Sequence, residues 1–465
     1  MTEKVKESGH REQDVALSHT EEKDVRDNQS LNSVSLYAIV HREGLEELQR
    51  PMMSLWWSGV AAGIGISISI LAEGILHHLF ANSPNQFVIE NLGYTVGFVL
   101  VIVGRLQLFT ENTMWRRYPL KDHYDVVIIG AGVHGLSTAY YLAKQGVNNV
   151  AVIDKGYVGG GASGRNTAII RANYLTKEGI PFFRESLSLY QDLAGELNFN
   201  LLFDQSGRLD LGHTESALYG LRSRTGMNRL LGVDSEMIGP SEVKRLVPAI
   251  DLREGKPLPI LGALHQSTAG VLRHDAVVWG YGRGADRLGV EIHPFTEVTG
   301  IVIEGGRVTG VDIGGQVVRS DIVMSATAGW SSNIARMVNM TLPLVTHPLQ
   351  AFVTEPLKPF ISRSVSSANL HAYIYQTDRG EVVVGGGVDP YSSYSQRSTL
   401  QTLEHLAANT LEMFPFLRGV NVMRQWAGLC DMSPDYAPIM GAVDGLPGFM
   451  LSCGWGTWGF KAGPI

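Results

Sequence analysis

The residue types best suited to chemistry gather in residues 124–154, where three spaced glycines are followed by an aspartate. Gly130, Gly132 and Gly135 form a G-x-G-x-x-G pattern. In such a loop the first glycine permits a tight turn, the second lets a pyrophosphate approach the backbone, and the third lets a helix pack on a strand. Asp154 ends the next apolar run, where a carboxylate can accept a hydrogen bond from a ribose hydroxyl. The pattern predicts a dinucleotide-binding site.

The elements around these glycines are the ones that such a site requires. Residues 125–129 form a β-branched run typical of a buried parallel strand. Residues 136–145 have helical spacing and end at Gly146, and residues 150–153 form a second apolar strand. In a chain with 53 glycines the same pattern can arise by chance in a turn that binds nothing. The order strand, loop, helix, strand and acid favours the nucleotide site over that alternative.

A second loop of small residues follows at residues 159–164. Its backbone N–H groups can face a phosphate or a flavin, whereas a flexible surface loop of the same composition would bind nothing. The candidate cofactor ligands in this loop and beside it are polar side chains: Lys155, Ser163, Arg165, Asn166 and Thr167.

Length and composition allow two or three domains and exclude several classes of partner. The chain has 465 residues and a formal net charge of −7, so nucleic acid is not an expected partner. Cys430 and Cys453 are too few for a disulfide framework, which indicates a reducing compartment. The 14 histidines are scattered without the spacing of a metal-ligand set, so no metal site is predicted.

The composition of the first 117 residues differs from that of the rest. Residues 1–34 are charged and polar, and they predict a disordered tail because they cannot bury enough apolar surface. Residues 35–117 predict a transmembrane hairpin of two helices, at residues 52–76 and 92–109. A buried core helix is the alternative for the first of these segments.

The distribution of basic residues orients the predicted hairpin. Lysines and arginines lie before Met52 and after Met114, and residues 77–91 between the spans contain none. The positive-inside rule then places both ends of the hairpin in the cytoplasm. We expect membrane contact through residues 52–109, with the rest of the chain cytoplasmic; if the hairpin is a fusion artefact, the protein is simply cytoplasmic.

Residues 40–114 also carry a resemblance to a known family. The stretches WWSGVAAGIGISISILAEG and LGYTVGFVLVIVGRLQLFTENT resemble the first two spans of the formate/nitrite transporter family. That family breaks its second span at an LFT-type motif, matched here by Leu108, Phe109 and Thr110. Such channels need six spans per subunit, so the resemblance implies an anchor or the remnant of a fusion rather than a working pore.

From residue 118 the pattern changes to alternating strands and helices, which predicts an α/β fold. Residues 208–211 and 262–265 predict strands of a second, mainly antiparallel layer, which gives this part an α+β character. Helices are predicted at residues 183–197 and 273–289.

Residues 124–464 resemble the β subunit of heterotetrameric sarcosine oxidase, within the D-amino-acid oxidase superfamily of FAD enzymes. The stretches that carry the resemblance include IIGAGVHGLSTAYYLAK, GGGASGRNTAIIRANY, TAGVLRHDAVVWGYGR, WAGLCDMSPDYAPIMG and CGWGTWGFKAGP. It implies a Rossmann-type FAD-binding domain plus a substrate domain with a twisted sheet, together spanning residues 118–465. The implied FAD-binding segments are residues 124–175, 270–335 and 428–465, and the implied substrate segments are residues 176–269 and 336–427.

The resemblance also implies the catalytic residues. A substrate carboxylate calls for fixed cations, ideally with one planar guanidinium. Arg171 falls where the family places a carboxylate-binding arginine, and Lys461 where it places the partner lysine. Without the resemblance, both would be taken as surface or tail residues.

His274, in the setting R-H-D-A-V, matches the histidine that carries covalently bound FMN in the heterotetrameric enzymes. A lone histidine near a helix start is otherwise more often a cap or a surface residue. The remaining implied cofactor contacts lie in two glycine-rich stretches: Gly329, Gly454, Gly456, Thr457 and Gly459. Trp458 departs from the family, which usually has glycine there, and we expect its indole to crowd the cofactor.

Together these features predict a flavoprotein that oxidises sarcosine or a similar N-methyl amino acid to the imine, which hydrolyses to glycine and formaldehyde. Electrons would pass from FAD to FMN and then to oxygen, and the other sarcosine oxidase subunits are possible partners. One alternative is a related FAD-dependent amine or amino-acid dehydrogenase that feeds a membrane acceptor. Another is a membrane-anchored, transporter-derived chimera without catalysis.

Overall fold

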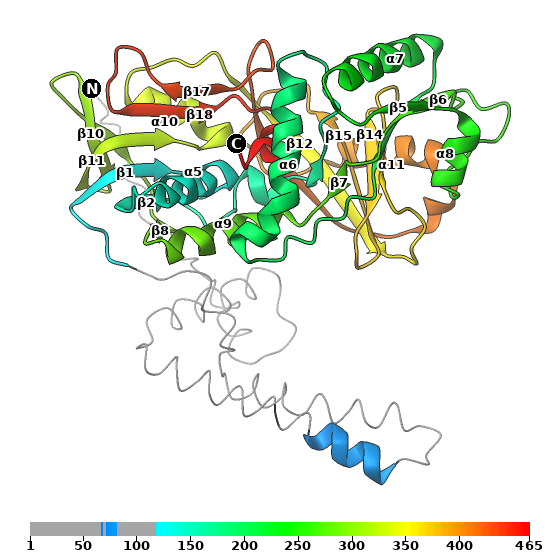
Figure 1. Cartoon of the computed structure of the whole chain (residues 1–465), viewed down its shortest axis with the longest axis horizontal. Helices are drawn as coiled ribbons and strands as arrows, with labels where there is room; N and C mark the ends of the chain where they lie inside the picture. The colour runs from blue at the N-terminus through cyan, green and yellow to red at the C-terminus, as the bar shows by residue number, and fades with distance from the viewer. Residues whose placement is uncertain (1–66, 68–70, 81–117) are drawn as a thin grey trace, which may run out of the picture. The chain divides into compact units, whose positions relative to one another are not determined.

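A computed structural model describes residues 67, 71–80 and 118–465 of the chain (Figure 1). Residues 71–79 are helical, and no helix in these described ranges is both long enough and apolar enough to cross a membrane. The predicted tail at residues 1–34 lies outside the described residues, as does nearly all of the predicted hairpin at residues 35–117. Every element below belongs to the compact unit that ends at Ile465.

One eight-stranded sheet, here called sheet A, contains the predicted strand–helix–strand unit (Figure 1). Its strands run in the order β17-β18-β11-β1-β2-β8, and the hairpin β9–β10 joins β11 beside this path. The strands from β18 to β8 are parallel, and β17 is antiparallel to β18. The strand bounds are β1 His123–Ile129, β2 Val150–Ile153, β8 Glu291–His293, β9 Gly300–Glu304, β10 Arg307–Ile313, β11 Gln316–Ser325, β17 Ile439–Ala442 and β18 Phe449–Cys453.

Residues 126–129 of β1 and all of β2 are apolar and buried, as expected where both faces of a parallel sheet are covered. On β1, Val126 and Ile128 pack toward one core while Val127 and Ile129 pack toward the other. The first core lies under helices α5, α6 and α9, and the second lies under the β9–β10 hairpin and α10. Each such fully buried side chain contributes roughly 1.5–3 kcal/mol. The helix bounds are α5 Val133–Lys144, α6 Gly179–Leu197, α9 His274–Arg287 and α10 Ser331–Met337.

The second eight-stranded sheet, here called sheet C, has the order β16-β12-β15-β14-β13-β4-β6-β5. Its neighbours are antiparallel except for the parallel pair β13–β4. The predicted strands at residues 208–211 and 262–265 are confirmed, since β4 and β6 pair directly. The strand bounds are β4 Arg208–Gly212, β5 Glu236–Ile238, β6 Gly262–Gln266, β12 Val345–Pro356, β13 Ser364–Ser367, β14 Ala372–Gln376, β15 Glu381–Val388 and β16 Val422–Met432.

Helices α8 and α11 supply apolar side chains to the core of sheet C. A two-stranded ribbon of β3 and β7 completes the strands of the described part of the chain. The bounds of the remaining elements are η2 Ala162–Arg165, β3 Ile169–Ile170, α7 Glu215–Leu230, α8 Pro240–Leu246, β7 Gly270–Val271, η3 Ala328–Trp330, α11 Leu400–Met413, η4 Pro415–Gly419 and η5 Gly459–Ala462.

Neither sheet is built from one continuous stretch of sequence. Sheet A takes strands from residues 123–153, 291–325 and 439–453, and sheet C takes strands from residues 208–266 and 345–432. The chain therefore passes repeatedly from one sheet to the other. Segments near these crossings carry most of the predicted site residues, which places them where the two sheets meet.

Candidate active site

A cavity of about 890 Å³ is lined by elements of both sheets, a size and position typical of small-molecule sites. Most of the predicted site residues line it, and the exceptions are Gly135, Gly454 and His274. The predicted residues that line the cavity are Gly130, Gly132, Asp154, Lys155, Ser163, Arg165, Asn166, Thr167, Arg171, Gly329, Gly456, Thr457, Gly459 and Lys461.

The glycine turn after β1 is held by backbone contacts that leave no room for side chains. Gly130 has a φ of 112°, and a Cβ there would lie 2.5 Å from the carbonyl oxygen of Ala326. A Cβ on Gly135 would lie 1.9 Å from the carbonyl oxygen of Gly130. Gly135 is therefore absent from the cavity lining because its place is the contact between α5 and the turn.

The start of α5 faces the cavity and carries no acidic residue in its first turn. Its N-cap residue, Gly132, offers no side chain, and instead Ser163 caps the helix by accepting a 2.9 Å hydrogen bond from the backbone N–H of Val133. The cap thus comes from the second small-residue loop. A helix start of this kind favours an anion such as a phosphate, because its N–H groups and dipole both point outward.

Asp154 is fixed at the end of β2 by two backbone donors. One carboxylate oxygen accepts from the N–H of Ala131 at 2.8 Å and the other from the N–H of Gly156 at 2.8 Å. Each oxygen keeps a second lone pair for a further donor. The neighbouring Lys155 places its ammonium 3.6 Å from the centroid of the Trp330 ring, a cation–π contact at the cavity wall.

A buried aspartate that the sequence analysis did not single out holds the last glycine loop. Asp431, at the end of β16, accepts a 2.5 Å hydrogen bond from the N–H of Gly454 through its carboxylate, and its backbone oxygen accepts from the N–H of Gly456 at 3.0 Å. Burial raises the pKa of Asp431 to about 6. Gly454 and Gly456 have φ values of 71° and 53°, so Gly454 shapes the loop although it does not line the cavity. The one sequence signal for Asp431 is a carboxylate directly after an apolar run at residues 426–430.

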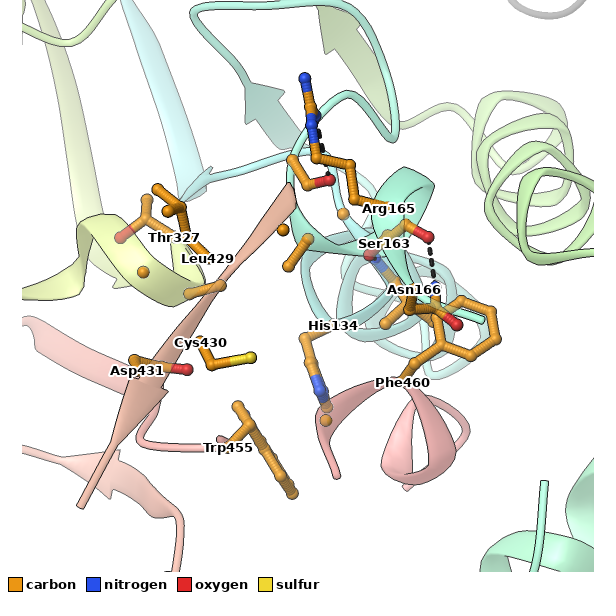
Figure 2. A pocket seen from close by; sticks show the side chains of 18 of the residues that line it. His134, Ser163, Arg165, Asn166, Thr327, Leu429, Cys430, Asp431, Trp455 and Phe460 are labelled. Atoms are coloured by element: carbon orange, nitrogen blue, oxygen red, sulfur yellow. Dashed lines mark hydrogen bonds between the residues drawn. The ribbon is translucent and has the colours of Figure 1, made fainter. Parts of the chain in front are cut away.

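Two further side chains, His134 and Cys430, point into the same region (Figure 2). The His134 ring stacks on Trp455 at 4.3 Å, and its Nε2 atom is buried without a hydrogen-bond partner among the described residues. Burial lowers the pKa of His134 to about 4, so the imidazole is neutral at neutral pH. The Cys430 side chain also points inward, and burial raises its pKa to about 12, which keeps it as an unreactive thiol.

Two of the predicted catalytic residues, Arg171 and Lys461, are cations that line the cavity. Arg171 follows β3, and its Nη1 donates to the side-chain oxygen of Asn173 at 2.7 Å and to the Asn173 carbonyl at 3.0 Å. The Lys461 ammonium, in η5, donates to the carbonyl of Thr457 at 3.2 Å. Burial, and then the charges of Arg171 and Arg208, lower the pKa of Lys461 to about 7. The structure thus brings Arg171 and Lys461 to one cavity and adds Arg208, which the sequence analysis missed.

His274 lies apart from these groups. It is the first residue of α9, and its Nε2 lies 2.9 Å from the carbonyl oxygen of Gly164 in the loop that carries η2. Burial lowers the pKa of His274, and its side chain is 27% exposed. His274 therefore contacts a loop whose other residues line the cavity, but it does not line the cavity itself.

Trp458, the residue that departs from the family pattern, lines the cavity. Its indole packs edge-on against Tyr174 at 5.2 Å and Phe183 at 6.2 Å. These contacts hold the ring in an aromatic cluster beside α6. The predicted crowding of a cofactor remains a prediction.

Comparison with known proteins shows the family. The model of the family described as FAD dependent oxidoreductase matches residues 125–465. The chain belongs to this family. Separately, the formate/nitrite transporter family model matches residues 34–123.

Named relatives agree with this family. The sarcosine oxidase subunit beta of Rhizobium meliloti is 45% identical over 75% of this chain and 84% of its own length. The corresponding protein of Rhodobacter capsulatus is 42% identical with the same coverage. Among solved structures, L-proline dehydrogenase from P. horikoshii matches with a TM-score of 0.70 and 27% identity, over 74% of this chain and 91% of that chain. FAD-dependent oxidation of an amino acid is the activity that these matches support.

Two features of the cavity fit FAD. The glycine turn, where a Cβ on Gly130 would overlap the Ala326 carbonyl, and the capped start of α5 together suit a pyrophosphate. The unpaired Nε2 of His134 and the free lone pairs of Asp154 offer polar partners along the same cavity. Among the described residues that line the cavity, the acidic ones are Asp154, Asp431 and Glu297.

Proposed function

We propose that residues 118–465 bind FAD in this cavity and oxidise sarcosine or a similar N-methyl amino acid to the imine, which then hydrolyses to glycine and formaldehyde. The observation that carries the proposal is that Arg171 and Lys461, which are far apart in the sequence, line the same cavity as the glycine turn. The names of the relatives, sarcosine oxidase subunit beta, support the substrate class.

The chain's own residues would orient the substrate. Arg171 and Lys461 would hold the carboxylate, with the guanidinium fixed by Asn173 and by its contact with the Tyr174 ring at 4.4 Å. Bound FAD supplies the acceptor for the hydride that leaves the methyl carbon. The aromatic walls at Trp455 and Trp458 would limit access of water to this position.

The cofactor would be held in three places. The glycine turn and the α5 start would hold the pyrophosphate, Asp154 would accept from the ribose, and the loop that carries Gly456 and Gly459 would face the flavin. We assign residues 124–175, 270–335 and 428–465 to this FAD-binding part and residues 176–269 and 336–427 to the substrate part.

A second flavin completes the proposal. His274 would hold FMN covalently, and bound FMN would supply the route for electrons to oxygen. Because the named relatives are subunits, we also propose that this chain associates with other sarcosine oxidase subunits.

The test is anaerobic reduction of the bound flavin. Purified full-length protein should show flavin absorbance that bleaches on addition of sarcosine, while glycine and L-proline act more slowly or not at all. Absence of bleaching by every N-methyl amino acid in a panel would contradict the proposal. Arg245→Ala, which removes an exposed arginine paired with Glu242, is the control that should bleach at the normal rate.

The match to the transporter family at residues 34–123 favours one other candidate, an amino-acid dehydrogenase that passes electrons to a membrane acceptor. Reoxidation separates the two. Rapid recovery of flavin absorbance with oxygen supports the oxidase, whereas slow recovery with oxygen and rapid recovery with a soluble quinone supports the dehydrogenase.

A further inference from the structure

A buried polar cluster lies next to the cavity wall that carries Arg171. Its members are almost fully removed from solvent: Asn173 is 0% exposed, Asp210 7% and Arg208 8%. Arg208 and Asp210 lie on β4, and of the two only Arg208 reaches the cavity lining. Charged groups this deeply buried are stable only when they are paired. Removing any contact in the cluster should therefore destabilise the fold.

Asp210 is the one carboxylate of this cluster, and its oxygens accept from four side chains. Arg208 donates from Nε at 3.0 Å, and Asn173 donates from Nδ2 at 2.7 Å. Arg224 and the Ser366 hydroxyl also donate to it. Burial raises the pKa of Asp210, but the charges of Arg208 and Arg224 outweigh burial and hold the pKa below its usual range. Asp210 is therefore ionised at any working pH.

The Asn173 side chain connects this carboxylate to the cavity. Because its amide nitrogen faces Asp210, its amide oxygen must face the opposite way, and there it accepts from Arg171 at 2.7 Å. The backbone N–H of Asn173 donates to the side chain of Gln266 at 3.2 Å, which fixes the residue from another side. A reversed amide would set NH₂ against the Arg171 guanidinium, donor against donor. The charge on Asp210 thus selects the amide orientation that holds Arg171.

We propose that Asp210 is a positioning residue for substrate binding: through Asn173 it fixes the Arg171 guanidinium for the substrate carboxylate. This inference rests on the proposed function, in which Arg171 binds the carboxylate. Asp210 itself touches neither substrate nor cofactor in this scheme.

The Asp210 carboxylate is also connected to the pKa of Lys461, through its pairing with Arg208. The charged groups that act on Lys461 are Arg171 and Arg208, which lower its pKa, while Cys430 raises it. Asp210 lies against Arg208 and screens that guanidinium. Loss of the Asp210 charge should therefore make Lys461 release its proton at lower pH, and carboxylate binding should weaken at lower pH than in the wild type.

The test uses full-length, flavin-loaded protein and two probes: acetate, followed by the change in flavin absorbance, and sarcosine, followed by anaerobic bleaching. For Asp210→Asn we expect the dissociation constant for each to rise about tenfold, while the bleaching rate at saturation changes less than about threefold. The pH at which acetate binding weakens should move downward. Asn173→Ala, which keeps both arginine partners of Asp210, should give a smaller rise of the same kind and guards against failure of Asp210→Asn to fold.

A double-mutant cycle decides whether Asp210 acts through Arg171. In an Arg171→Ala background, Asp210→Asn should add little to the loss of acetate affinity, since the group that it positions is already gone. Fully additive effects would overturn the inference, as would wild-type binding and pH dependence in both Asp210→Asn and Asn173→Ala. The matched control is Asp251→Asn, a half-buried carboxylate paired with Arg253 and Lys256 in another part of the fold, which should bind acetate normally.

These outcomes separate the inference from the proposed function. If wild-type protein bleaches with sarcosine but the Asp210 and Asn173 variants behave like it, the inference fails and the function stands. If wild-type protein bleaches with no N-methyl amino acid, the proposed function fails, and acetate titration still reports on the network.

Discussion

The two ends of the cavity are built in different ways. The nucleotide end is shaped by backbone: the turn at Gly130 leaves no room for a side chain, and the start of α5 faces the cavity. A second part of the lining, here called the charged end, consists of charged side chains: Arg171, Arg208 and Lys461 line the cavity, and Asp210 pairs with Arg208 outside the lining. A site built from backbone should lose its ligand when a substitution adds even one side-chain atom. A site built from charged side chains should be more sensitive to a substitution that changes charge than to one that changes shape.

This difference predicts that mutations at the two ends fail in different ways. Damage at the nucleotide end should remove the cofactor and with it every activity. Damage at the charged end should leave the cofactor in place and remove only substrate affinity.

The largest effect is expected for Gly135→Ala. The added Cβ would overlap the Gly130 carbonyl at 1.9 Å, and both partners are backbone, so the helix or the turn must shift. We expect a loss of flavin content and a destabilisation of about 3 kcal/mol, measured by bound flavin per folded protein and by denaturant unfolding. Gly195→Ala is the control, because a Cβ there meets nothing within 4 Å. Full flavin content in Gly135→Ala would contradict the idea of a backbone-built end.

The next effect is expected for Arg171→Ala at the charged end. The protein should keep its flavin, while the dissociation constant for sarcosine rises roughly tenfold to a hundredfold, as expected for the loss of a charge-assisted hydrogen bond of about 1.5–3 kcal/mol. Anaerobic bleaching against substrate concentration measures this change. Loss of flavin from this variant would show that the two ends are not independent.

A pH titration sharpens the comparison further. The pKa of Lys461 is lowered to about 7, so the ammonium is charged below pH 7 and neutral above it. Acetate should bind about tenfold more weakly at pH 8.5 than at pH 6, while flavin content stays constant across this range. In Lys461→Met the pH dependence should disappear. Equal affinity at both pH values in the wild type would exclude Lys461 as a carboxylate ligand.

The smallest effect on substrate oxidation is expected for His274→Ala, since His274 lies at neither end of the cavity. Bleaching by sarcosine should stay within about twofold of the wild type, because surface substitutions away from a site rarely matter more. Flavin absorbance that survives denaturation should be present in the wild type and absent in the variant. If wild-type protein loses all flavin on denaturation, the FMN assignment is wrong.

The same contrast explains how much the sequence could predict. The unit β1–α5–β2 was predicted almost to its bounds, because a buried parallel strand, a glycine turn and a helix are all local patterns. The largest difference is at the start of α5: the helix begins at Val133, three residues before the predicted Leu136, since Ser163 caps it from a distant loop. A local pattern contains no information about such a cap.

The charged end was largely invisible in the sequence. Arg208 and Asp210 alternate with leucines on β4, a pattern that normally indicates a strand with one face in water. In the fold all five residues of β4 are buried, and its polar side chains are paired by Asn173, Arg224 and Ser366 from distant segments. Pairing between such distant segments cannot be derived from spacing. Asp431 was missed because the glycine loop that it holds is also a distant segment of the sequence. Arg171 and Lys461 were predicted only through the family resemblance.

The interleaved strands also impose an order of events during synthesis. The glycine turn emerges from the ribosome early, but β11, which flanks β1 in the sheet, and the loop held by Asp431 are translated much later. The nascent chain must therefore keep the apolar surface of β1, β2 and α5 from aggregating until nearly all of the polypeptide is available. Chaperone occupancy and the supply of free flavin at that late stage should govern how much active protein a cell obtains.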